Sequence, residues 1–106
     1  MNTKEMTYIG SFIVDSGQAM VGDPCYLDSW QHKYENFDEH HKHSGEYSYL
    51  GACNATLTEG YGELGRGNGV VFSTGYGDGA YPVYAEFNDE GRVARVVIEF
   101  IGEDEE

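Results

Sequence analysis

The sequence predicts a mainly β fold, a small antiparallel sandwich or barrel of about six strands with one short helix at most. Three observations lead to this prediction. The chain combines strand formers with turn formers, since it has nine tyrosines, five phenylalanines and 15 glycines. Its apolar segments are short and mostly alternate with polar residues. Turn signals separate them about every 8–12 residues. At 106 residues we expect one domain over residues 1–106.

The N-terminal quarter predicts two strands. Residues 7–14 are rich in β-branched and aromatic side chains and form the first strand, which the Asp-Ser-Gly turn at 15–17 ends. Residues 18–21 resume as a second short strand. The Gly-Asp-Pro segment at 22–24 stops the pairing, because proline lacks an amide proton and restricts the residue before it.

A polar, histidine-rich insert at about 27–46 follows. Trp30, Tyr34 and Phe37 are spaced as one stripe of a helix, which Asp28 or Ser29 would cap, so this insert carries the one short helix. The histidine run at 40–45 breaks the stripe and predicts a mobile loop.

The middle of the chain returns to strand signals. Residues 47–57 alternate between larger apolar and small polar side chains, which predicts a strand. Residues 60–69 contain five glycines and predict a loop or a pair of tight turns. Residues 70–74 are a compact apolar run and predict another strand.

A β-hairpin is the clearest element. Residues 81–87 and 94–100 both alternate, and the Asn-Asp-Glu-Gly segment between them suits a type I turn followed by a left-handed glycine. Pro82 stands near the start of its strand, which predicts an edge strand. An edge can pair between protomers, so we expect a monomer or an edge-strand dimer. Residues 102–106 predict a solvated acidic tail.

The charge balance limits the classes of partner. Six Lys and Arg stand against 19 Asp and Glu, a net charge of −13, which excludes direct binding to nucleic acid or to an anionic membrane. Without a signal peptide or a long apolar run, we expect a soluble, cytoplasmic protein. Cys25 and Cys53 are too few for a disulfide framework and are interpreted as small, buried packing residues.

Two sets of side chains are candidate metal ligands. Aspartates in turns can hold a divalent cation or act as a general acid/base pair where a fold brings them together, and imidazoles bind zinc, nickel or copper. The candidates are Asp15, Asp23, Asp78, His40, His41 and His43, and His32 also belongs to the histidine cluster. The simpler interpretation is that the aspartates form turns and the histidines a solvated loop. We predict no catalytic residue and no cofactor, with a divalent metal as the alternative.

A second set of residues is a candidate binding surface. Tyrosine offers a large contact area with few torsions to freeze, which favours interfaces, although tyrosines also cover small sheets in general. The glycines at 60, 62 and 65 match a dinucleotide fingerprint, but no helix follows them, so we interpret this segment as an inter-strand loop. The candidate ligand- or partner-binding residues are Tyr61, Arg66, Tyr76, Asp78 and Tyr84.

Two segments carry a family resemblance. Residues 14–26 contain the Asp-Ser-Gly turn and an Asp-Pro, and residues 74–100 contain Gly-Asp-Gly-Ala-Tyr-Pro-Val-Tyr and the hairpin after it. Together they resemble a family of small bacterial and bacteriophage proteins of unknown function. The resemblance implies a β-rich fold and a phage or prophage source. It also implies that Asp15, Asp23 and Asp78 share a surface, and it implies no activity.

These observations leave three functions. The first is a non-enzymatic binding module for a protein or small ligand, which we favour because no convergent nucleophile or base is visible. The second is an acidic DNA mimic that inhibits a host DNA-binding protein. The third is a small metal-dependent hydrolase that uses Asp15, Asp23 and Asp78, with His40 or His41 beside them.

Overall fold

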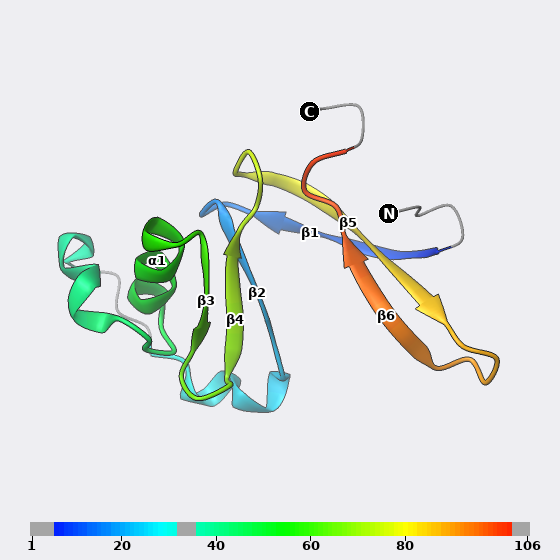
Figure 1. The fold of residues 1–106 in the computed structure, drawn as a ribbon, viewed down its shortest axis with the longest axis horizontal. Helices are drawn as coiled ribbons and strands as arrows, with labels where there is room; N and C mark the ends of the chain where they lie inside the picture. Colours follow the sequence, from blue (N-terminus) through cyan, green and yellow to red (C-terminus); the bar gives the residue numbers. More distant parts are fainter. Residues whose placement is uncertain (1–5, 32–35, 103–106) are drawn as a thin grey trace. The chain divides into compact units, whose positions relative to one another are not determined.

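The computed structural model describes residues 6–31 and 36–102. It is mainly β, with six strands in two antiparallel sheets, one α-helix and two 3-10 helices, and neither sheet closes into a barrel (Figure 1). The chain divides into two compact units. One combines the segment up to Gly17 with residues from Thr74 onward, and the other is Gln18–Ser73. No helix within the described ranges is long and apolar enough to cross a membrane.

The first unit is a three-stranded antiparallel sheet in the order β1-β5-β6. Its strands are β1 (Thr7–Val14), β5 (Gly79–Phe87) and β6 (Val93–Ile98). β1 pairs with β5 along its whole length, with a register shift between Tyr8 and Gly10. The predicted first strand and the predicted hairpin are therefore confirmed.

The hairpin turn also forms as its residues predict. Gly91 has a φ of 80°, and its N–H donates to the Asn88 carbonyl at 3.0 Å. The Asn88 side-chain oxygen accepts from the backbone N–H groups of Glu90 and Arg92, which closes the turn locally. On the strands, Arg95 lies opposite Glu86 and pairs with it at 2.8 Å.

The prediction that the Pro82 strand lies at an edge is wrong, because β5 is the central strand. Pairing between β5 and β6 begins at Val83 and Ile98, so the β6 ladder does not reach Pro82, whose partner is Ser11 of β1. A prolyl nitrogen at this position removes no hydrogen bond to β6. Proline is tolerated because this end of the central strand has a strand partner on one side.

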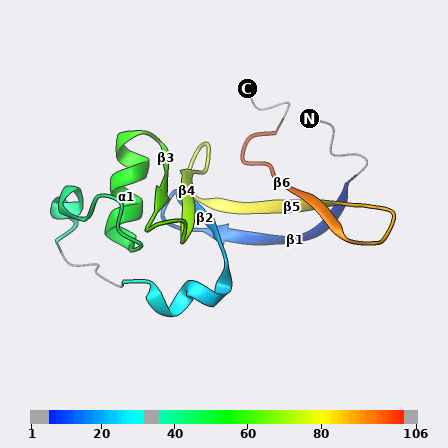
Figure 2. The same cartoon turned by 60° about the horizontal axis from the view of Figure 1, so that its bottom comes forward.

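The second unit packs a helix on a second sheet. The sheet has the order β2-β4-β3, from β2 (Gln18–Gly22), β4 (Gly69–Ser73) and β3 (Tyr61–Leu64). The helix α1 (Tyr49–Thr58) lies against β3 and β4, as Figure 2 shows. The buried core of this unit consists of Tyr47, Ala52, Leu64 and Val71, with Met20, Trp30 and Ala55 packed around it.

The prediction of a strand at 47–57 is wrong, because residues 49–58 are helical. Ser48 caps the helix through its side-chain oxygen, and Gly60 ends it in the left-handed region with a φ of 89°. Gly51 is so close to the Glu46 carbonyl that a Cβ would not fit there. A glycine at this position thus lets the helix pack closely on the segment before it. An alternating pattern in the sequence does not indicate such a close approach.

The glycine-rich segment 60–69 also differs from its prediction as a loop, because it contains β3. Leu64 is fully buried in this strand, and pairing with β4 runs from Tyr61 opposite Phe72 to Leu64 opposite Gly69. The turn at 65–68 then leads into β4. The glycines here surround a short strand rather than replace it.

Two 3-10 helices lie in the described part of the polar insert and just before it, η1 (Pro24–Ser29) and η2 (Phe37–His43). The prediction of a single helix through Trp30 and Phe37 is wrong. Among the described residues, Trp30 has an extended backbone and Asn36 a left-handed one, so no helix continues through them. Tyr34 and His32 lie outside the described residues, as does the acidic tail after Gly102. The prediction of a loop at 40–45 is wrong for residues 40–43, which belong to η2. This helix packs against α1.

Candidate functional site

The loop before β5 is bound to the turn after β1. The Asp78 carboxylate accepts a hydrogen bond from the Gly17 backbone N–H at 2.8 Å. The Thr74 N–H donates to the Gly17 carbonyl at 3.1 Å. These two bonds hold the turn at 15–17 and the loop at 74–79 together within the first unit. They join the two motifs that carry the family resemblance.

Two hydroxyl groups fix the inside of this loop. Thr74 is fully buried, and its Oγ1 donates to the Gly77 carbonyl at 2.7 Å. The Tyr81 hydroxyl lies within hydrogen-bond distance of the carbonyls of Thr74, at 3.1 Å, and of Gly77. A carbonyl oxygen has two lone pairs, so Gly77 can accept from both hydroxyls. The loop is therefore bound to the start of β5.

The ring of Tyr81 packs on one aromatic side chain from β1 and one from the segment after β6. It meets Phe100 edge to face at 5.1 Å and Phe12 in a tilted arrangement at 6.3 Å between centroids. On the loop itself, Gly75 has a φ of 61°, and a Cβ there would press on the Ile101 side chain at 2.8 Å. The segment after β6 thus packs directly against the loop.

A pocket of about 260 Å³ lies beside Tyr81. Its lining residues are Ala80, Tyr81, Pro82, Glu99, Phe100 and Gly102. The pocket lies beyond the point where pairing between β5 and β6 stops. One wall is the first part of β5, and the other is the segment that follows β6. Pockets for drug-sized ligands have volumes of about 300–1,000 Å³, so this one suits a side chain or a small molecule.

The aspartates proposed as metal ligands have different surroundings. Asp78 is bound to Gly17, and Asp15 is exposed in the turn at 15–17. Asp23 caps η1, because its Oδ1 accepts from the Cys25 N–H at 2.9 Å. Across residues 6–31 and 36–102, no three His, Cys, Asp or Glu side chains gather in a way that could hold a metal ion. The metal site stays a prediction.

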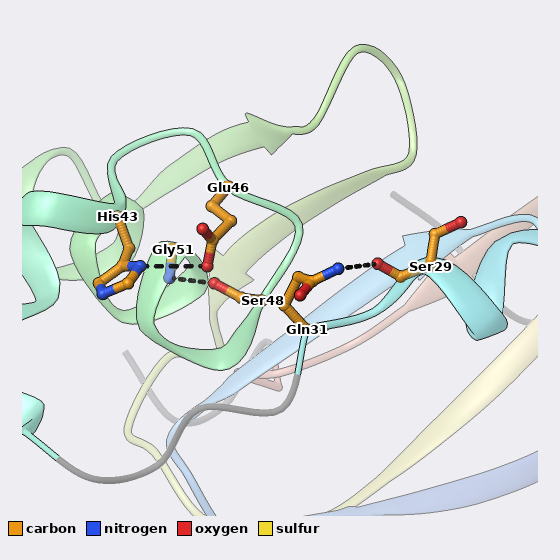
Figure 3. A network of polar contacts seen from close by, with 6 residues as sticks. All are labelled: Ser29, Gln31, His43, Glu46, Ser48 and Gly51. Atoms are coloured by element: carbon orange, nitrogen blue, oxygen red, sulfur yellow. Dashed lines mark hydrogen bonds and ion pairs between the residues drawn. The ribbon is translucent and has the colours of Figure 1, made fainter.

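The described histidines lie in η2 beside α1. His43 Nδ1 is 3.2 Å from Glu46 Oε1, and Ser48 Oγ accepts from the Gly51 N–H at 2.9 Å at the start of the helix, as Figure 3 shows. His40 Nδ1 is 3.3 Å from the Asn54 amide nitrogen. His41 is exposed and stacks edge to face on His40. The contact between His40 and Asn54 connects η2 with α1.

The two cysteines differ in their exposure to solvent. Cys53 is buried in α1, as expected, and the Gln18 amide donates to its sulfur at 3.5 Å. Cys25 is exposed in η1, so its interpretation as a buried packing residue is wrong. Its position just after the cap of η1 explains the exposure, because that helix buries none of its residues.

A family model described as "Protein of unknown function (DUF4241)" matches residues 2–98. The chain belongs to the DUF4241 family. The DUF4241 match extends over both units and includes the loop and the β5 wall of the pocket. It ends at residue 98, just before Glu99 and Phe100 of the other wall. No curated protein matches the chain, and no solved structure does.

In this DUF4241 member, the residues predicted for binding fall in both units. Tyr76 and Asp78 lie in the loop before β5, where Tyr76 is 75% exposed. Tyr84 is half-buried on β5 and packs edge to face on Tyr8 at 6.1 Å. Tyr61 on β3 and Arg66 in the turn after it are exposed in the other unit. Their binding roles stay predictions.

Sequence reasoning missed the residues that build the pocket. Tyr81 and Phe100 were assigned to alternating strands, and Glu99 was assigned no role. The available signal was the Tyr-Pro pair directly after Gly-Asp-Gly, because proline in a strand indicates a place where pairing is one-sided. The contact between Tyr81 and Phe100 has no comparable local signal.

Proposed function

We propose that this chain is a non-catalytic binding module whose ligand site is the pocket between residues 80–82 of β5 and residues 99–102. The observation that carries the proposal is the double role of Tyr81. Its hydroxyl contacts the loop carbonyls, its ring packs edge to face on Phe100, and both of these residues line the pocket. A wall held in this way is already in position before a ligand arrives, which lowers the entropic cost of binding.

The chemistry of the lining favours binding over catalysis. The only ionisable side chains among the six lining residues are those of Tyr81 and Glu99. The Tyr81 hydroxyl is engaged by the loop, so Glu99 is the one group available for proton transfer. Hydrolytic sites normally combine a base with a nucleophile or an electrophilic group. A recognition site needs only shape, aromatic surface and one oriented polar group.

The proposed setting is a bacterial or phage-encoded accessory protein, which rests on the sequence motifs alone. The partner would be a protein or a small ligand. A partner protein would carry complementary positive charge, because the chain has a net charge of −13. An acidic DNA mimic would also require a positively charged partner protein, but it would not require a pocket.

The test is a chemical-shift titration of the full ¹⁵N-labelled chain with five blocked amino acids. These are the N-acetyl amides of arginine, glutamate, phenylalanine, leucine and asparagine. We expect at least one to shift the amide signals of Tyr81 and Phe100 in a saturable way. If none of the five shifts these signals, the proposal is wrong.

A pair of phenylalanine variants provides the control. Phe100→Ala removes one wall of the pocket and should abolish the saturable shifts. Phe87→Ala removes an exposed phenylalanine at the other end of β5, away from the lining residues, and should leave the binding curve unchanged. Equal effects of the two variants would also contradict the proposal.

A further inference from the structure

We propose that the pocket receives the guanidinium group of an arginine presented by a basic polypeptide partner. This inference rests on the proposed function, because it names the ligand of the same pocket. Three properties of the lining lead to it: two aromatic residues, one acidic residue and a small volume.

The aromatic rings provide a surface for a flat cation. Tyr81 and Phe100 both line the pocket, with an interplanar angle of 83° and a centroid distance of 5.1 Å. A cation within about 6 Å of an aromatic face is attracted by the negative charge of that face. Because guanidinium is planar and weakly hydrated, it stacks on such rings better than an ammonium group does.

The carboxylate provides the matching charge. Glu99 is the only charged residue of the lining, and it is half-buried. It forms no ion pair with any Lys or Arg that the structure describes. A carboxylate accepts two parallel N–H bonds from a guanidinium, a pairing that fixes orientation as well as charge. The same carboxylate disfavours an anionic ligand.

The arginines of this unit do not compete for Glu99. Arg95 pairs with Glu86 at 2.8 Å, and Arg92 lies 3.9 Å from Glu90. Neither of these arginines is then available to the pocket, and we assign the cation to another molecule. A chain with a net charge of −13 attracts a basic polypeptide over a longer range than any single pair can, which favours a protein segment as the source.

The test compares two probes of nearly the same shape by isothermal titration on the full chain. N-acetyl-arginine amide carries the guanidinium, and N-acetyl-citrulline amide replaces it with a neutral urea. We expect the arginine probe to bind at least about tenfold more tightly, and its affinity to fall as salt is added. Equal affinity for the two probes would overturn the inference.

Two variants separate the local role of Glu99 from the loss of one negative charge. Glu99→Gln should weaken binding of the arginine probe about tenfold. Asp89→Asn makes the same change in net charge at the exposed hairpin turn and should alter affinity less than about twofold. An equal loss in both variants, or no loss in Glu99→Gln, would contradict a specific contact.

The source of the guanidinium is tested with a longer and a shorter probe. The blocked tripeptide Gly-Arg-Gly should bind at least as tightly as N-acetyl-arginine amide, because a partner chain has to leave the pocket in both directions. Binding of methylguanidinium without binding of the tripeptide would contradict a polypeptide partner. If the leucine or phenylalanine probe binds and the arginine probe does not, this inference fails while the proposed function stands. If no probe binds, both fail.

Discussion

Asp78 accepts a hydrogen bond from the Gly17 backbone N–H at 2.8 Å, and so joins two turns that are 61 residues apart in the sequence. Asp78→Ala removes the acceptor, and the Gly17 amide should then exchange with solvent several-fold faster. Because the bond is exposed, the loss in unfolding free energy should be about 0.5 kcal/mol. Hydrogen exchange followed by NMR measures both. Asp78→Asn keeps an oxygen acceptor and should retain most of the protection, and equal exchange in wild type and Asp78→Ala would count against the contact.

The Tyr81 hydroxyl has a separate, measurable role. Tyr81→Phe keeps the ring but removes the hydroxyl donor that the Thr74 and Gly77 carbonyls share, so we expect a loss of about 1 kcal/mol in urea unfolding. Tyr84→Phe on the same strand is the matched control and should change stability less. A stability loss as large in Tyr84→Phe would show that the loop bonds are not the cause.

The buried cap of α1 should contribute to the stability of the second unit. Ser48 is fully buried, and its Oγ accepts from the Gly51 N–H at 2.9 Å. Ser48→Ala leaves that donor without its cap, which should cost about 1 kcal/mol in urea unfolding. Ser29→Ala in exposed η1 serves as control and should have little effect. Unchanged stability in Ser48→Ala would rule out the cap.

Gly51→Ala gives a test in which two physical effects have opposite signs. Helix propensity alone predicts that alanine stabilises α1 by about 1 kcal/mol. In the structure, a Cβ at this position would collide with the Glu46 carbonyl, which is backbone and cannot simply rotate away. We therefore expect a clear decrease in thermal stability. An increase would mean that the helix does not pack this closely on the segment before it.

The sequence was most informative where structure is set by neighbouring residues. The hairpin could be predicted because Asn88 and Gly91 determine the turn locally, and alternation determines both strands. The helix at 49–58 was missed because its residues alternate with a period of two and form no clear apolar stripe at the helical period. Ser48 as a cap and Gly60 as a terminator were the signals that favour the helix.

The expected number of strands was correct although one of the six was misplaced. The strand assigned to 47–57 is a helix, and β3 lies in the glycine-rich segment that follows. β3 has four residues, and three glycines flank or interrupt it, which hides its pattern. The pocket could not be predicted at all, because it depends on where β6 stops pairing with β5. No local pattern in the sequence indicates that position, which lies just before Phe100 and its contact with Tyr81.

The most direct test of the proposed ligand site is intermolecular NOE spectroscopy on the full chain, with whichever of the five blocked amino acids binds most tightly. The account predicts NOEs from the side chain of the probe to the ring protons of both Tyr81 and Phe100. NOEs confined to exposed aromatic rings elsewhere, such as Tyr61 or Tyr76, would contradict it.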